Sequence, residues 1–199
     1  MSNNLAKDMD FCDLLSFELF SNLENKKVFE QLIFNGADIN YKTKTGWNIL
    51  FEAVSKDLDE VIVKLIELKI DLNIRDNKGR NALFWAIYYR NIKCIKKLIS
   101  LGIDTKVTSA LTAVNYAVYR NDIKVLRVLK NCGLNLHEKD DVNSTPLIYA
   151  VLYNRLQSID YLLENKACIK HRDFLGNSAY TLAKDLKIRY LIDKFEKLA

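Results

Sequence analysis

Apolar residues recur along the chain in short segments with helical spacing, and the segments come in pairs. The first member of a pair is centred on an alanine, as in "NALFWAI" at residues 81–87. The second member carries larger apolar residues three or four positions apart, which places them on one face of a helix. These larger residues are Ile62, Leu65 and Ile66, then Ile95, Leu98 and Ile99, then Leu126 and Leu129, then Ile159, Leu162 and Leu163. The pattern predicts an all-α chain of paired helices.

The paired segments form an internal repeat. The alanine holds the same place in five segments, at Ala53, Ala86, Ala117, Ala150 and Ala183, which are 33, 31, 33 and 33 residues apart. A second series of segments, "GADIN", "KIDLN", "GIDTK", "GLNLH" and "KACIK", repeats at the same intervals, the short one included. Two independent motifs that share one irregular spacing indicate a stack of similar units, which bury their apolar faces against one another.

One segment carries most of a known repeat motif. "TPLIYA" at 145–150 matches the T-P-L-H-x-A start of an ankyrin repeat except at Ile148, and other units have Asn48, Asn81 or Ser178 in place of the threonine. The chain therefore resembles the ankyrin-repeat family over nearly its whole length. The resemblance implies an all-α ankyrin-repeat solenoid of stacked helix-turn-helix units joined by short β-turn fingers. It also implies that partners dock on a concave groove, lined by the first helices and the finger tips.

The repeat boundaries predict the domain organisation. Because a single proline and six glycines leave no flexible linker, we expect one domain over residues 1–199. It is divided into an N-terminal capping repeat at 1–43, internal repeats at 44–76, 77–107, 108–140 and 141–173, and a C-terminal capping repeat at 174–199.

Individual residues at the ends of the predicted helices fit this division. Thr145 or Asn81 can cap a first helix, and Pro146 can occupy its first position. Second helices are followed by a slot where a left-handed residue is expected. The slot holds Gly36, Gly102 and Gly133 in three units and Lys69 and Lys166 in two others. We expect mild backbone strain at the two lysines.

The first helices of three central repeats share an aromatic face. In "ALFWAIYYRN", residues 82–91, the side chains at i, i+3 and i+4 are all aromatic, and two of the three equivalent side chains are aromatic in each of the next two repeats. The nine positions are Trp85, Tyr88 and Tyr89, then Tyr116, Tyr119 and Arg120, then Tyr149, Leu152 and Tyr153. They hold six of the ten tyrosines and no phenylalanine, which favours a surface where one end of each ring stays wet. We predict an exposed partner-binding face; the alternative is that the rings pack between repeats.

The fingers extend the predicted surface. Trp47 in "KTGWN" occupies a finger position that we expect to face solvent, so we include it among the partner-binding residues. The finger before Thr112, at residues 106–111, is two residues shorter than its counterparts and lacks the D-x-x-G of "DNKG" and "DFLG". We expect the groove to be interrupted or kinked there, either as shaping for a partner or through neutral drift.

A basic cluster is the rival surface. Six basic residues fall on the second helices of two neighbouring repeats, in a chain whose net charge is +5: Lys93, Lys96, Lys97, Lys124, Arg127 and Lys130. Such a cluster could attract nucleic acid, an anionic membrane or an acidic protein. The alternative is a solvated outer face, which the lack of interleaved aromatic residues favours.

The sequence offers little for catalysis. The two histidines, His137 and His171, lie near finger tips without a serine or cysteine nucleophile in context, and no phosphate loop or metalloprotease motif is present. The cysteines, Cys12, Cys94, Cys132 and Cys168, are too dispersed for a disulfide framework or a zinc site. We expect no enzyme activity, no cofactor, no metal and no small-molecule substrate.

The N-terminal sequence predicts the location of the protein. Asp8, Asp10 and Asp13 interrupt the stretch where a signal peptide needs an apolar run, and no later segment is long enough to span a membrane. We therefore expect a cytoplasmic protein that is monomeric on its own.

These observations together predict a protein–protein interaction module. We expect it to bind one partner protein through its aromatic face, as an inhibitor or an immunity protein that neutralises a toxin. The alternatives are a secreted effector that binds a host protein, and a binder of nucleic acid or another acidic polymer through the basic cluster.

Overall fold

The helices are short and follow one another in pairs, as the apolar pattern predicts. The computed structural model describes residues 11–198, and within them twelve helices form six helix-turn-helix pairs. The described residues contain no extended strand, only the isolated bridges Lys42–Asn48 and Lys106–Thr112 at two fingers. The all-α prediction is confirmed. The chain divides into two compact units, one ending at Asp104 and the other beginning at Thr105.

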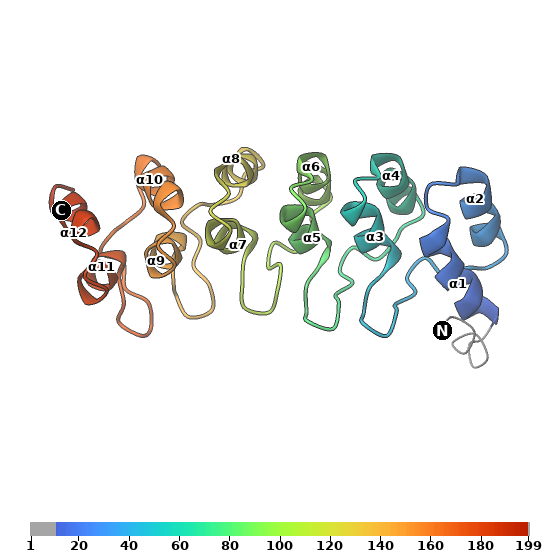
Figure 1. Cartoon of the computed structure of the whole chain (residues 1–199), viewed down its shortest axis with the longest axis horizontal. Coiled ribbons are helices and arrows are strands. Elements are labelled where there is room, and N and C mark those ends of the chain that lie inside the picture. Colours follow the sequence, from blue (N-terminus) through green and yellow to red (C-terminus); the bar gives the residue numbers. More distant parts are fainter. Residues whose placement is uncertain (1–10, 199) are drawn as a thin grey trace. The chain divides into compact units, whose positions relative to one another are not determined.

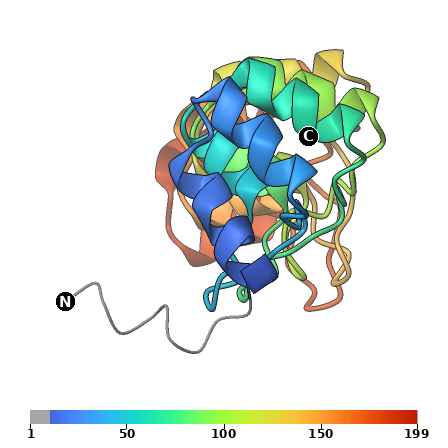
Figure 2. The same ribbon diagram turned by 90° about the vertical axis from the view of Figure 1, so that its right-hand side faces the viewer.

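Unit 1 contains three helix pairs in two layers. The helices are α1 (Phe11–Ser21), α2 (Lys26–Phe34), α3 (Ile49–Ser55), α4 (Asp59–Glu67), α5 (Ala82–Tyr88) and α6 (Ile92–Ser100). The first helices α1, α3 and α5 form one layer, α2, α4 and α6 form the other, and the fingers extend from the first-helix layer (Figure 1). Figure 2 views this unit from the end where α1 and α2 lie side by side.

Unit 2 repeats the arrangement. Its helices are α7 (Ala113–Tyr119), α8 (Ile123–Asn131), α9 (Pro146–Leu152), α10 (Leu156–Glu164), α11 (Ala179–Asp185) and α12 (Arg189–Glu196). Here α9 packs between α7 and α11, and each first helix packs on the second helix of its own pair. The expectation of one continuous domain concerns the relation between the two units and stays a prediction.

Side-chain caps set the starts of the first helices. The Asn81 side chain accepts a hydrogen bond from the Phe84 N–H at 3.0 Å, and Thr112 accepts one from the Asn115 N–H at 3.1 Å. Asn48, Thr145 and Ser178 cap their helices in the same way. Each cap is worth about 1 kcal/mol, since it satisfies a helix N–H that otherwise has no partner. The caps predicted at Asn81 and Thr145 are confirmed.

The repeated alanines form the centre of the core. All five are fully buried, and so is the leucine of each neighbouring second helix, such as Leu65 or Leu98. A larger side chain at these positions would overpack the contact between neighbouring helices, because interiors are packed without voids. The alanine that identifies the repeat in the sequence is therefore a packing requirement.

Second helices end at a left-handed residue, as predicted. The φ angles are +95° at Gly36, +77° at Gly102 and +89° at Gly133. Lys69 and Lys166 adopt the same conformation with φ of +62° and +64°. A side chain with a Cβ atom is strained in this region, so the two lysines lower stability slightly.

The fingers close on their own polar side chains. Asp76 and Asp173 each accept two backbone N–H bonds across the finger, and Asp140 does the same. In the shortened finger, Thr108 takes that role and accepts from the N–H groups of Ala110 and Leu111 at 3.2 and 3.0 Å. This finger is thus an ordered turn. It directly follows the boundary between the units; the predicted interruption of a groove there stays a prediction.

Candidate protein-binding surface

Trp85 is the centre of the aromatic cluster in unit 1, and it is buried. Only 7% of its surface is exposed. The ring meets Trp47 edge to face at 4.6 Å between centroids, and the Arg80 guanidinium lies 4.2 Å from its centroid. The expectation of an exposed Trp85 is therefore wrong. The residue before the repeated alanine points toward the neighbouring repeat, where another aromatic side chain covers it.

Trp47 provides that cover. It is half-buried, so the expectation that it faces solvent is wrong. Its ring packs on Trp85 and also on Phe51, with 5.7 Å between the centroids of Trp47 and Phe51. Its indole N–H donates to the Glu52 carboxylate at 2.8 Å. Glu52 also pairs with Lys56 at 3.2 Å. Trp47 thus ties a finger to the first-helix layer.

Two tyrosines at the end of α5 remain exposed. Tyr88 is 46% and Tyr89 44% exposed. Tyr88 stacks on Phe84 and Tyr89 on Trp85, with interplanar angles of 11° and 26°, and the two tyrosine rings meet edge to face at 5.0 Å. Half of each ring is therefore held in place by aromatic neighbours while the other half faces water. We call Tyr88 and Tyr89 the α5 patch.

Tyr116 in unit 2 is the counterpart of Trp85 and is likewise buried, with 5% of its surface exposed. Arg120, half-buried, lies against it: the guanidinium is 5.9 Å from the ring centroid, and its Nη1 donates to the phenol oxygen at 3.4 Å. The expectation that Tyr116 is exposed is therefore wrong.

Tyr149 is half-buried and braces a finger. Its hydroxyl donates to the Asp140 carboxylate, whose other oxygen closes the finger turn. Burial raises the pKa of Tyr149 well above its usual value, and the hydrogen bond to Asp140 raises that pKa further. The residue before the repeated alanine therefore has a structural role in three successive repeats.

Exposed side chains of unit 2 gather between α7 and α9. Tyr119, Leu152 and Tyr153 are 43%, 46% and 41% exposed. Tyr119 meets Tyr153 edge to face at 5.1 Å, Tyr153 stacks on Tyr149, and the Arg155 guanidinium lies 5.4 Å from the Tyr119 ring. We call Tyr119, Leu152 and Tyr153 the α7–α9 patch. Of the nine predicted face positions, the five exposed ones all lie C-terminal to the alanine, where Arg120 alone is half-buried.

Two finger tips carry exposed apolar residues that are not among the predicted partner-binding residues. Phe174 and Leu175 are 76% and 78% exposed, and the Phe174 N–H donates to the Val142 carbonyl of the preceding finger at 3.0 Å. Val142 is exposed as well. The sequence does contain a pattern that could have indicated them. The motif "DFLG" has Phe and Leu at the finger-tip positions where "DNKG" has Asn77 and Lys78.

The six basic residues lie on second helices, three in each unit. Lys93, Lys96 and Lys97 lie on α6 and Lys124, Arg127 and Lys130 on α8, and all six are exposed. Lys93 is already paired with Asp59 at 2.7 Å, and this hydrogen bond raises the pKa of the lysine. Lys130 donates to the Asn165 side chain and Arg127 lies over the Tyr161 ring. Several of these charges are thus engaged within the protein.

The described residues hold no histidine, cysteine and carboxylate cluster suited to a metal ion. Cys94 is buried, and burial raises the pKa of its thiol to about 12, so it is protonated at neutral pH. His171 lies with Nε2 at 2.8 Å from the Asn143 carbonyl. None of the described helices has the length and apolar composition that crossing a lipid bilayer requires.

Comparisons with known proteins match the repeat geometry. The family model described as "Ankyrin repeats (3 copies)" matches residues 19–109 and 107–173. Ankyrin repeat protein L371 of Acanthamoeba polyphaga mimivirus is 32% identical over 144 residues, which are 71% of this chain and 19% of that protein. This chain therefore spans only a small part of that relative.

A solved structure shares the fold. It is described as the predatory endopeptidase Bd0816 from Bdellovibrio bacteriovorus in complex with immunity protein Bd3460. The match has a TM-score of 0.67 and 22% identity, and covers 86% of this chain and 92% of that chain. Ankyrin repeats suggest a protein-binding module rather than a catalyst. The helix pairs, the repeated alanines and the family match together show that the chain belongs to the ankyrin-repeat family.

Proposed function

We propose that the protein binds one partner protein through the exposed tyrosines of its first-helix layer and inhibits it, in the manner of an immunity protein. The observation that carries the proposal is the state of these tyrosines: they are about half exposed, yet each is stacked on a buried or half-buried aromatic neighbour. An ordered side chain loses little conformational entropy on binding, so such rings make efficient contacts.

The residue types support the same proposal. Tyrosine, tryptophan and arginine dominate the energetics of protein interfaces, and isolated apolar residues at the rim exclude water around them. The α7–α9 patch combines Tyr119 and Tyr153 with Leu152 and lies beside Arg155. In the same unit, Phe174 and Leu175 add exposed apolar surface at a finger tip.

Inhibition is the finer part of the proposal. A preformed surface that needs no rearrangement suits stoichiometric binding that covers a partner's working surface. The fold match to a complex of an endopeptidase with an immunity protein makes an endopeptidase the first class of partner to test. The alternative version, an effector that binds a host protein, uses the same surface with a different partner.

A capture experiment tests this proposal. The protein, immobilised through its N-terminus, is incubated with an extract of the native organism, and the products of neighbouring genes are tested individually. We expect one protein bound at a ratio of one to one, with its activity lost on binding. A captured partner that keeps full activity would contradict the inhibitor role, and a partner from a host extract would favour the effector version.

A further inference from the structure

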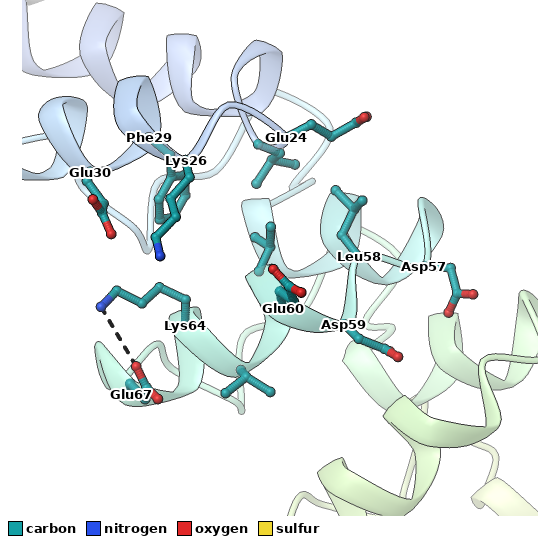
Figure 3. A pocket seen from close by; sticks show the side chains of 13 residues that line it. Glu24, Lys26, Phe29, Glu30, Asp57, Leu58, Asp59, Glu60, Lys64 and Glu67 are labelled. Atoms are coloured by element: carbon teal, nitrogen blue, oxygen red, sulfur yellow. Dashed lines mark ion pairs between the residues drawn. The ribbon is translucent and has the colours of Figure 1, made fainter.

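A cleft lies in the second-helix layer of unit 1, whereas the α5 patch of that unit lies in the first-helix layer. It has a volume of about 590 Å³ and is lined by residues of α2, α4 and the turns before them (Figure 3). Whereas α4 packs against α3 and α6, α2 packs chiefly on α1, and α2 and α4 are not a closely packed pair. The cleft is the space that this separation leaves.

The floor of the cleft is apolar. Leu23 and Phe29 are buried beneath it, Leu58 and Val61 are half-buried along it, and Val63 is 43% exposed. Surface of this kind, open to water and bounded by polar groups, is typical of a docking groove. Helix α4 is nine residues long, or about 13 Å, which matches two to three turns of a helix laid along it.

The rim is acidic, and the charge is uneven. At one end Lys26 and Lys64 accompany Glu30 and Glu67, so that the charges balance, and Lys64 pairs with Glu67 at 3.8 Å (Figure 3). Toward the other end lie four acidic residues and no lining lysine: Glu24, Asp57, Asp59 and Glu60. This acidic end lies on a chain whose net charge is +5.

Most carboxylates of the acidic end make no ion pair among the described residues. Asp59 pairs with Lys93, whose charge also acts on Asp57 from a greater distance. Glu24, Asp57 and Glu60 make no ion pair within residues 11–198. Carboxylates in the first turn of α4 complement the helix dipole, which accounts for Asp59 and Glu60. It does not account for Glu24, which precedes α2 in the sequence, or for Asp57, which lies in the turn before α4.

We propose that the α2–α4 cleft binds an amphipathic helical segment of a partner protein, with apolar side chains on the floor and lysine or arginine side chains toward the acidic end. Helix-in-groove recognition uses apolar anchors at i, i+3, i+4 and i+7, which the length of α4 accommodates. Opposite charges at the rim set the orientation of the segment and speed its association. This site is separate from the tyrosine patches and stands independently of the proposed inhibitor role.

The test uses the full chain and a synthetic probe. The probe is a peptide of leucine and lysine, about 14 residues long, with leucines at helical spacing; its counterpart has glutamate in place of every lysine. Backbone amide NMR shifts report the site, and a titration gives the affinity. We expect shifts at residues 23–30 and 57–67, binding of the lysine peptide only, and an affinity that falls as salt rises.

Two matched triple variants test whether the carboxylates of the acidic end contribute to binding of the lysine peptide. The triple change Glu24→Gln, Asp57→Asn and Glu60→Gln should weaken binding of the lysine peptide about tenfold, the sum of three exposed ion pairs. The control Glu164→Gln, Asp185→Asn and Asp193→Asn alters the net charge equally at exposed sites in unit 2 and should leave the affinity unchanged. Val63→Ser, on the floor, should weaken binding without changing its salt dependence.

Four results would overturn the proposal: no shifts in the cleft, equal binding of the glutamate peptide, equal loss of affinity in both triple variants, or no loss in either. Deletion of residues 1–10 provides a further check. If that deletion alone shifts the cleft amides and increases probe binding, the cleft is occupied by the chain's own N-terminal segment and not by a partner.

Discussion

At the residue scale, one position of the repeat decides which aromatic side chains are structural. Of the residues before the repeated alanine, Trp85 packs against the neighbouring repeat and Tyr149 braces its own finger, and Trp85 and Tyr116 are buried. The residues two and three positions after the alanine, such as Tyr88 and Tyr119, keep half of their surface in water. One face of a first helix thus contains a buried residue that stabilises the fold and exposed residues that are available for a partner.

This difference predicts the stability of alanine variants. Trp85→Ala and Tyr116→Ala should each destabilise the fold by about 3–5 kcal/mol, because each empties a buried aromatic site. Tyr88→Ala and Tyr119→Ala should cost less than about 1 kcal/mol, as exposed positions do. Urea unfolding of the four variants measures the differences. Similar losses in all four would show that the exposed tyrosines are as structural as the buried ones.

The raised pKa of Tyr149 predicts how the stability of the fold depends on pH. Its pKa is raised in the folded state, so the stability that its protonated form contributes is complete below the pKa of an unfolded tyrosine, about 10, and is lost as the pH rises beyond it. Tyr149→Phe should lower stability at neutral pH by about 1 kcal/mol, since Asp140 loses a donor. The variant should also lose less stability than the wild type between about pH 10 and 11. Parallel curves in that range would contradict this role of Tyr149.

The sequence could predict which helix face is aromatic but not which rings are buried. Helical spacing identifies the nine positions, and the choice of tyrosine over phenylalanine correctly indicates a wet surface at Tyr88, Tyr89, Tyr119 and Tyr153. Burial of Trp85 depends on Trp47, a residue of the preceding finger whose side chain turns onto it. That contact joins residues far apart in the sequence, and no local pattern reports it.

At the scale of the element, the identity of the left-handed residue after each second helix changes the free energy of unfolding by a small amount. Lys69 holds the conformation that Gly102 holds one repeat later, and a Cβ atom at Gly102 would meet no neighbour within 4 Å. The two sites therefore differ in backbone strain and not in packing. Lys69→Gly should stabilise the protein by about 0.5–1 kcal/mol, and Gly102→Lys should destabilise it by a similar amount.

Thermal or urea unfolding of these two variants, and of the double exchange, provides the measurement. The double variant should have the stability of the wild type, because the sites are independent. A Lys69→Gly variant less stable than the wild type would show that the lysine side chain makes a contribution larger than the strain.

The elements themselves were the most predictable part of the molecule. Caps at Asn81 and Thr145 and left-handed slots at Lys69 and Lys166 follow from local rules that act within a few residues, and all are confirmed. The shortened finger is different. Its turn is closed by Thr108 in place of an aspartate, a substitution that the D-x-x-G pattern excludes but hydrogen-bond chemistry allows.

At the scale of the whole molecule, the basic residues and the tyrosines lie in different layers of each unit. Changing the six basic residues Lys93, Lys96, Lys97, Lys124, Arg127 and Lys130 to glutamate should therefore leave the affinity for the captured partner within a few-fold. A titration of the partner against this variant checks the expectation. Loss of binding with the fold intact, or steeply salt-dependent binding of the wild type to DNA, would favour the basic surface instead.

The most direct test of the tyrosine surface is the affinity of the captured partner for two double variants. Tyr88→Ala with Tyr89→Ala removes the α5 patch, and Tyr119→Ala with Tyr153→Ala removes the tyrosines of the α7–α9 patch. Tyr190→Ala is the matched control, because Tyr190 is 47% exposed on α12 in the second-helix layer. We predict a loss of about 1–4 kcal/mol of binding free energy in at least one double variant and none in the control. Unchanged affinity in both double variants would contradict partner binding through the exposed tyrosines.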